Sequence, residues 1–227
     1  MMLTKEEVDQ ELIKSSKIFH FGTLSSTHPG VREATRYAVD VAKEYGLIIS
    51  FDPNLRETLW GSLDQAKEEI SYGMSKCDIL KISDNEMEFM TGTTDYTKGV
   101  EMLREQFDIP LICVTLGKNG SRAYYKDMIV KGAPFVRKDT IETTGAGDTF
   151  EACMLNYILE HGLEHLTEDN LKEMLTFANA GASIITTKKG ALKVMPEREE
   201  IQEMIKKRQE KLCTDSEYPQ KFPGRCR

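Results

Sequence analysis

Four short apolar segments alternate with helical patterns along the first half of this chain, and no other sequence feature limits its fold as strongly. The apolar segments, each of strand length, occupy 17–22, 47–52, 77–83 and 110–117. Strands that are apolar throughout are typical of parallel sheets, because helices cover both faces of such sheets. The order strand, helix, strand, helix indicates the same class. The sequence therefore predicts an α/β fold with a mostly parallel sheet covered on both sides.

The other elements are predicted from capping residues and hydrophobic periodicity. A capping box formed by Thr4 and Glu7 predicts a helix at the N-terminus. Residues 122–133 are predicted to form an antiparallel hairpin. Further helices are predicted at 29–46, 62–76, 84–90, 95–107, 148–160, 168–187 and 196–210. The segment 212–227 has two prolines and no periodicity, so we expect a flexible tail after a single domain spanning 1–211.

Composition and charge exclude several classes of function. The net charge of −7 argues against nucleic acid or an anionic membrane as a partner. The first residues are acidic and polar, unlike a signal peptide, and no apolar run approaches a membrane span in length. Five cysteines without CxxC spacing indicate a reduced, cytoplasmic chain with neither disulfides nor a zinc site. His161 and His165 are four residues apart, but Gly162 between them favours a helix end over a metal site.

The loops that follow the predicted strands are the expected location of a binding site. In parallel α/β folds, ligands bind at the carboxyl ends of the strands. The loops in question are 22–29, 52–61, 83–86, 117–120 and 140–148. They carry glycine or a carboxylate, which are residue types suited to binding phosphate or accepting protons.

The 140–148 loop contains Gly145, Ala146, Gly147 and Asp148 directly before a helical pattern. A helix N-terminus has free N–H groups and a partial positive charge, and glycines let these amides approach an anion closely. The segment is therefore predicted to hold a phosphate, with Asp148 as a metal ligand or as a base that accepts a hydroxyl proton. A tight turn in which Asp148 only caps the helix is also compatible with these residues. The segment is not a Walker loop, and it lacks the third glycine of the dinucleotide motif.

Five segments resemble, in the same order, motifs of the ribokinase-like (PfkB) sugar kinases. They are FDPNLRETLW (51–60), DILKISDNEMEFMTG (78–92), VTLGKNGS (114–121), TTGAGDTF (143–150) and FANAGASIITTKKGALKVMP (177–196). The resemblance runs from about residue 15 to 205, and the Leu-Trp ending of the first segment is similar to fructokinases. It implies a ribokinase-like three-layer sandwich and the ATP-dependent phosphorylation of a sugar hydroxyl, with fructose to fructose 6-phosphate as the expected reaction. It also implies ATP and Mg²⁺ as cofactors.

The resemblance assigns a role to each residue of the glycine-rich segment. Asp148 would take the proton from the primary hydroxyl of the sugar. Gly145, Ala146 and Gly147 would supply the amides of an anion hole, in which charge developing on the transferred phosphoryl group is stabilised. The roles agree with the reading of these residues as a phosphate-binding helix start.

ATP is implied to lie beside Thr115, Gly117 and Gly120, and beside Asn179 on the adenine side. The glycines would let the loop at the strand end lie against the nucleotide. The sequence GKNG is also typical of a hairpin turn, and both descriptions can hold at once. Asn179 is otherwise an ordinary helix residue.

Two further residues have an implied role and an alternative. Glu86 would hold water around Mg²⁺ on the phosphates, but it also forms a capping box with Ser83. Arg56 would hold sugar hydroxyls or a phosphate, and its alternative is a salt bridge with Glu57 or Asp52.

Glu142 stands where the family usually has an aspartate that helps to hold a monovalent cation. Glutamate keeps the negative charge but is longer by one methylene group. The sequence therefore leaves activation by K⁺ open.

The N-terminal strands of the family, with their sugar-binding Gly-Gly/Asn motif, and the small β lid that often forms the dimer have no counterpart here. We therefore expect an exposed sheet edge, little or no sugar kinase activity of this chain alone, and a homodimer only in a full-length form. The alternatives are a non-catalytic remnant that binds nucleotide weakly or pairs with another chain, a PfkB kinase for 2-keto-3-deoxygluconate or ribose, and an unrelated α/β phosphate-binding enzyme.

Overall fold

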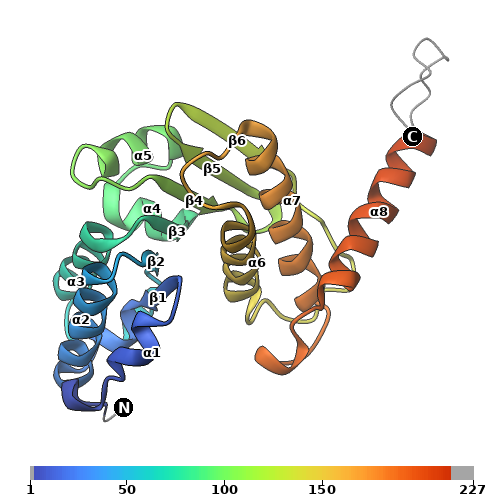
Figure 1. Cartoon of the computed structure of the whole chain (residues 1–227). Helices are drawn as coiled ribbons and strands as arrows, with labels where there is room; N and C mark the ends of the chain where they lie inside the picture. The colour runs from blue at the N-terminus through green and yellow to red at the C-terminus, as the bar shows by residue number, and fades with distance from the viewer. Residues whose placement is uncertain (1–2, 216–227) are drawn as a thin grey trace.

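The computed structural model describes residues 3–215, with side chains through residue 211, and it is built around a six-stranded sheet (Figure 1). The strands are β1 (Ile18–Gly22), β2 (Ile48–Asp52), β3 (Ile79–Ser83), β4 (Leu111–Thr115), β5 (Ser121–Tyr125) and β6 (Met128–Gly132). They lie in the sheet in the order of the sequence. β1 to β4 pair in parallel, whereas β5 pairs antiparallel with both β4 and β6. The predicted mostly parallel sheet and the hairpin are confirmed.

Helices cover both faces of the sheet, which confirms the predicted three layers (Figure 1). One face is covered by α1 (Gln10–Lys14), α2 (Pro29–Glu44), α3 (Leu63–Lys76), α4 (Asp84–Thr91) and α5 (Tyr96–Arg104). The other face is covered by α6 (Ala146–His161) and α7 (Glu168–Ile185), and α8 (Arg198–Asp215) packs on α7 on the side away from the sheet. Each helical layer encloses its own hydrophobic core against the sheet.

β3 shows why the strands are apolar throughout. Leu80 and Ile82 pack into the core on the side of α2 to α5, and Ile79 packs into the core beside α6 and α7. Successive side chains of a strand point to opposite faces, so both faces must be apolar when both are covered. Lys81 shares its face with Ile79 and is also buried, which makes it an exception to this pattern.

The N-terminal helix differs from the prediction. The capping box of Thr4 and Glu7 is present, but it belongs to a short 3₁₀ turn, Lys5–Glu7. α1 begins separately after Asp9, whose side chain accepts the N–H of Leu12 at 3.0 Å. A second capping residue therefore divides the predicted helix into two short ones.

β1 forms one edge of the sheet, because β2 is its only strand partner among the described residues. The side chain of His20 is 44% exposed there, and Ile18 and Ile48 are half-buried. The expected exposed sheet edge is thus confirmed. An edge strand presents unpaired backbone groups to its surroundings.

The predicted tail, the cysteines and the membrane-spanning character of the helices are the remaining features of the fold. α8 continues beyond residue 210 to Asp215, and the remainder of the predicted tail, 216–227, lies outside the described residues. Cys77, Cys113 and Cys153 are buried free thiols. No helix within residues 3–215 has both the length and the apolar character needed to cross a membrane.

Candidate active site

The glycine-rich segment forms the start of α6, as predicted. Gly145 has a φ of 76°, a left-handed conformation that favours glycine, and α6 begins at the next residue. The N–H of Ala146 is bonded to the carbonyl of Thr143 at 3.1 Å. Within the described residues, the N–H groups of Gly147 and Asp148 have no protein acceptor. Two amides at the positive end of a helix are therefore free to bind an anion.

Asp148 lies in the first turn of α6 and is exposed. Its carboxylate forms no ion pair or hydrogen bond with a side chain or backbone group in the described part of the protein. A carboxylate without protein partners in this position can accept a proton from a hydroxyl held beside it.

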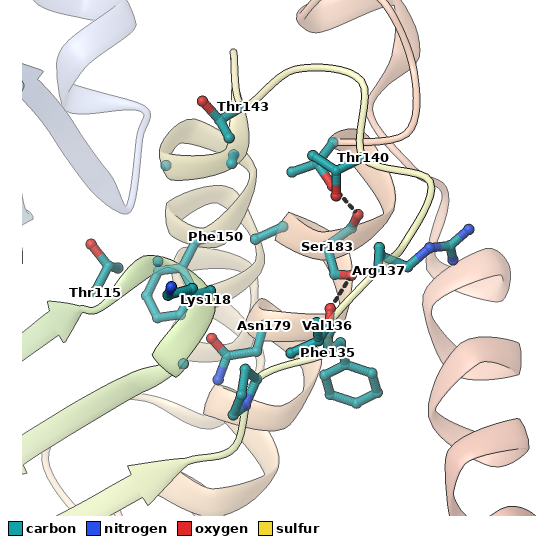
Figure 2. Close-up of a pocket in the computed structure, with 17 residues that line it drawn as sticks. Thr115, Lys118, Phe135, Val136, Arg137, Thr140, Thr143, Phe150, Asn179 and Ser183 are labelled. Carbon is teal, nitrogen blue, oxygen red and sulfur yellow. Dashed lines mark hydrogen bonds between the residues drawn. The ribbon is translucent and has the colours of Figure 1, made fainter.

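A pocket of about 320 Å³ adjoins this helix start (Figure 2). Its volume is in the range of small-molecule sites. Of the predicted site residues, six line it: Thr115, Gly117, Gly120, Ala146, Gly147 and Asn179. The pocket thus brings together the β4–β5 loop, the N-terminal turn of α6 and one face of α7.

The wall formed by residues 134–137 is a part of the pocket that the sequence did not reveal. Ser183 donates a hydrogen bond to the carbonyl of Phe135 at 2.5 Å (Figure 2), and Arg208 of α8 donates one to the carbonyl of Pro134 at 3.0 Å. The guanidinium of Arg208 also lies 4.3 Å from the centre of the Phe135 ring. The sequence contained one indication that Ser183 belongs to the pocket: it follows Asn179 by one helical turn and so lies on the same face of the helix.

Asn179 and Gly120 both shape the pocket through internal contacts. Asn179 is buried, and its side-chain amide donates to the hydroxyl of Ser121 at 2.8 Å, which ties α7 to β5. Gly120 has a φ of 88°, and a Cβ atom there would lie 2.2 Å from the carbonyl oxygen of Gly132. Gly120 is therefore required by the hairpin as well as by the pocket lining.

Glu86 holds the loop after β2 in place. One carboxylate oxygen accepts the backbone N–H of Leu55 at 2.8 Å, and the other accepts both the N–H and the hydroxyl of Ser83 at 2.8 Å. The capping box with Ser83 is confirmed. The carboxylate is buried, so these bonds fix the position of the loop that carries Arg56.

Arg56 does not form either of the salt bridges that its sequence neighbours suggested. Its guanidinium donates only to the carbonyl of the adjacent Leu55, at 3.1 Å. Asp52 is instead paired with Lys81, whose ammonium lies 2.7 Å from the carboxylate. Within the described residues, Arg56 is exposed and free of acidic partners.

Asp52, Lys81 and Glu151 form a buried group of charges between the sheet and α6. The sequence did not predict that these side chains lie together. Burial raises the pKa of Asp52 to about 6, although Lys81 opposes this shift. Glu151 of α6 accepts a hydrogen bond from Ser50 at 2.6 Å and lies 3.3 Å from a ring nitrogen of His20. The sequence contained an indication of this group, because Lys81 interrupts an apolar strand and Glu151 interrupts an apolar helix.

The remaining predictions concern metal ions, for which Glu142 and Glu86 are the predicted residues. One oxygen of Glu142 accepts the N–H of Gly190 at 2.7 Å, so it closes the loop after α7. In the described part of the chain, no group of three His, Cys, Asp or Glu side chains is arranged to hold a metal ion.

The fold and this site define a mostly parallel α/β protein in which a helix start with two free N–H groups borders a pocket of small-molecule size. The chain belongs to the pfkB family of carbohydrate kinases, whose family model matches residues 1–198. It is 42% identical to "Probable fructokinase-2" of Arabidopsis thaliana over 196 residues, which is 86% of this chain and 59% of that protein. It is 38% identical to "Putative fructokinase-8" of the same plant, with 86% of this chain and 93% of that protein covered.

Solved structures give the same result. The crystal structure of the Vibrio cholerae O395 fructokinase, bound to fructose, ADP and calcium, matches with a TM-score of 0.79 and 26% identity. The match covers 90% of this chain and 65% of that one. The chain therefore spans about three fifths of the length of most of these relatives.

Proposed function

We propose that this chain provides the nucleotide-binding and proton-accepting part of an ATP-dependent fructokinase. The observation that supports this most directly is the arrangement at the start of α6. Gly147, whose N–H is free, lines the pocket, and the exposed, unpaired carboxylate of Asp148 follows at the next residue. An anion site beside a proton acceptor is the minimum that phosphoryl transfer to a hydroxyl requires.

In this proposal the nucleotide occupies the 320 Å³ pocket. Thr115, Gly117 and Gly120 lie along its phosphate side, and Asn179 contributes to its adenine side. The amides at the start of α6 stabilise charge on the transferred phosphoryl group, because they are oriented before the reaction begins.

Asp148 accepts the proton of the attacking sugar hydroxyl in the same scheme. Arg56 binds sugar hydroxyls, since its guanidinium is free and its loop is fixed by Glu86. The chemical step then needs no covalent intermediate on the protein. Proton removal and charge stabilisation are both supplied by the first turn of one helix.

The residues present fit a divalent cation that is held chiefly by phosphate oxygens and water. Such binding is typical of Mg²⁺, which retains several of its waters. Glu86 has one oxygen that accepts a single protein hydrogen bond, so it can also accept one from such a water. The second oxygen of Glu142 has no protein donor in the described residues and is available to a monovalent cation such as K⁺.

Fructose is the proposed sugar for two reasons. The plant relatives described above are named as fructokinases, and the Vibrio cholerae fructokinase was solved with fructose bound. 2-Keto-3-deoxygluconate and ribose are the alternative sugars. A second candidate function is nucleotide binding without catalysis. It is favoured by the exposed edge strand β1 and by the share of each relative that this chain spans.

Release of ADP, measured with a coupled assay over a panel of sugars, tests the proposal. The 227-residue chain would be compared with a chimera that carries the N-terminal segment of a fructokinase relative. We expect ATP to bind both, and fructose to give the fastest release of ADP by the chimera. Binding of ATP without any sugar-dependent release by either protein would favour the non-catalytic function. Preference for another sugar would overturn the fructose assignment alone.

A further inference from the structure

Lys81 has an unusual position for a cation. It lies on β3, on the face of the sheet that is covered by α6, and it is only 6% exposed. Among the side chains that the structure describes, it is the one buried lysine or arginine. Burial opposes its charge, but Asp52 and further carboxylates raise the pKa of Lys81 above its usual value, so the ammonium remains charged.

The ammonium of Lys81 lies directly against the start of α6. A Cβ atom added to Gly147 would be 3.1 Å from its Nζ atom and 3.8 Å from its Cε atom. Glycine at this position therefore leaves room for the ammonium. The backbone of Gly147 also carries one of the two free N–H groups and lines the pocket. The charged ammonium of Lys81 and the free N–H of Gly147 therefore lie at the same place, the start of α6.

Apart from His20, which lies 3.3 Å from Glu151, the charged side chains around this point are negative. Asp52, Glu86 and Glu151 are 4%, 7% and 3% exposed, and all three act on the charge of Lys81. Three buried carboxylates against one buried ammonium would repel the phosphates of a nucleotide. Charges in a partly buried site interact more strongly than in water, so removing the single ammonium would increase this repulsion considerably.

We propose that Lys81 is a positioning residue of the phosphate site: its ammonium offsets the buried carboxylates and holds the phosphate end of a nucleotide against the Gly147 amide. The inference rests on the proposed nucleotide site and adds to it a residue outside the pocket lining. It also gives Asp52 a defined part, since this carboxylate holds the ammonium in position at 2.7 Å.

A simpler role is that Lys81 only neutralises Asp52. The two roles differ in what happens when both charges are removed together. If Lys81 is only a counterion, the double variant D52N/K81M has no unpaired charge and binds ATP normally. If Lys81 acts on the phosphates, the double variant recovers stability but still binds ATP weakly, because Glu86 and Glu151 are no longer offset.

The test measures binding of Mg·ATP by calorimetry and of adenosine by ligand-observed NMR, on the full 227-residue chain. The variants are Lys81→Met, Asp52→Asn and D52N/K81M, with Lys98→Met as a control at an exposed lysine of α5. We expect both Lys81 variants to bind ATP at least about tenfold more weakly, with adenosine binding unchanged. Asp52→Asn, which retains the ammonium, is expected to bind ATP as tightly as the unmodified chain or more tightly.

The outcomes are distinguishable. Normal ATP affinity of D52N/K81M overturns the inference and leaves the proposed function intact. Equal losses of ATP and adenosine binding in that variant, which indicate a structural role, also overturn it. Failure of the unmodified chain to bind ATP at all overturns the proposed function and this inference with it. If Lys81→Met alone does not fold, the double variant still decides the question.

Discussion

Glu86 and Leu55, 31 residues apart in the sequence, are joined by a hydrogen bond of 2.8 Å from the Leu55 N–H to the buried Glu86 carboxylate. Through this bond, the start of α4 fixes the loop that follows β2. The other carboxylate oxygen is bonded to Ser83, so the side chain serves both its own helix and a neighbouring strand end. The loop that carries Arg56 is therefore tied to α4 by a buried hydrogen bond.

Glu86→Gln should lower the free energy of unfolding by about 1–3 kcal/mol, because the new amide group is a donor that faces N–H groups inside the protein. Urea denaturation monitored by circular dichroism measures the change. Glu88→Gln is the matched control, since Glu88 is exposed on the same helix and should change stability by less than about 0.5 kcal/mol. Equal stability of the two variants would show that the bond to Leu55 contributes nothing.

Asp148→Asn should reduce fructose-dependent turnover of the catalytically complete chimera by about 10²–10⁴-fold, because the amide cannot accept the hydroxyl proton. The affinity for ATP should change by less than about threefold, since the shape of the helix start is retained. Initial rates of ADP release and calorimetric titration give the two values. Asp169→Asn makes the same change in the first turn of α7 and should leave both unaltered. Turnover near that of the unmodified protein would contradict the role of Asp148 as base.

Gly73→Ala should destabilise the protein by about 1–3 kcal/mol or more, because α3 and β2 are in direct contact at this point. A Cβ atom at Gly73 would lie 2.2 to 2.5 Å from ring atoms of Phe51, which is itself fully buried. Gly30→Ala near the start of α2 is the control: nothing lies within 4 Å of the added atom, and stability should stay equal or rise by up to about 1 kcal/mol. Thermal unfolding of both variants checks the prediction, and an equal shift of the two would refute it.

The pair of His20 and Glu151 should make stability depend on pH. Burial opposes the charge on His20, but the hydrogen bond and charge of Glu151, together with Asp52 and Asp148, raise the pKa of His20 above 6.5. A group whose pKa is raised by folding stabilises the protein below its unfolded pKa and loses this contribution as pH rises through its folded pKa. His20 is 44% exposed, so the contribution is screened and amounts to about 0.5–1 kcal/mol.

Urea denaturation at pH 5.5 and pH 8.5 measures this effect. The difference in stability between the unmodified chain and His20→Gln should be present at the lower pH and absent at the higher one. Asp52, with a pKa of about 6, titrates in both proteins and therefore largely cancels in the comparison. A difference that grows as pH rises would contradict the assigned direction of the His20 shift.

The elements and the helix start of the site could be predicted because they depend on neighbours in the sequence. The apolar strands show their burial on both faces through composition alone, as in residues 111–114. Gly145 at a left-handed position and the free amides after it follow from the local rules for helix termini. The division of the N-terminal helix at Asp9 was missed because a second capping residue follows Thr4 by only five residues.

The pocket and its charges could not be predicted in the same way. The wall at 134–137 has no periodicity of its own and is held by Ser183 and Arg208, which come from helices far along the chain. The sequence neighbours of Arg56 suggested salt bridges, but Asp52 is taken by Lys81 of the adjacent strand. Hydrogen bonds and ion pairs of this kind depend on which strands are adjacent in the sheet.

The α/β class, the strands, most helices and the glycine-rich start of α6 follow from the sequence, because hydrophobic periodicity and helix capping are local properties of the chain. The contacts of Lys81 with Gly147, of Glu86 with Leu55 and of Glu151 with His20 depend on the tertiary structure. A buried charge is tolerated only beside a partner, and the packing of helices against the sheet brings that partner into place.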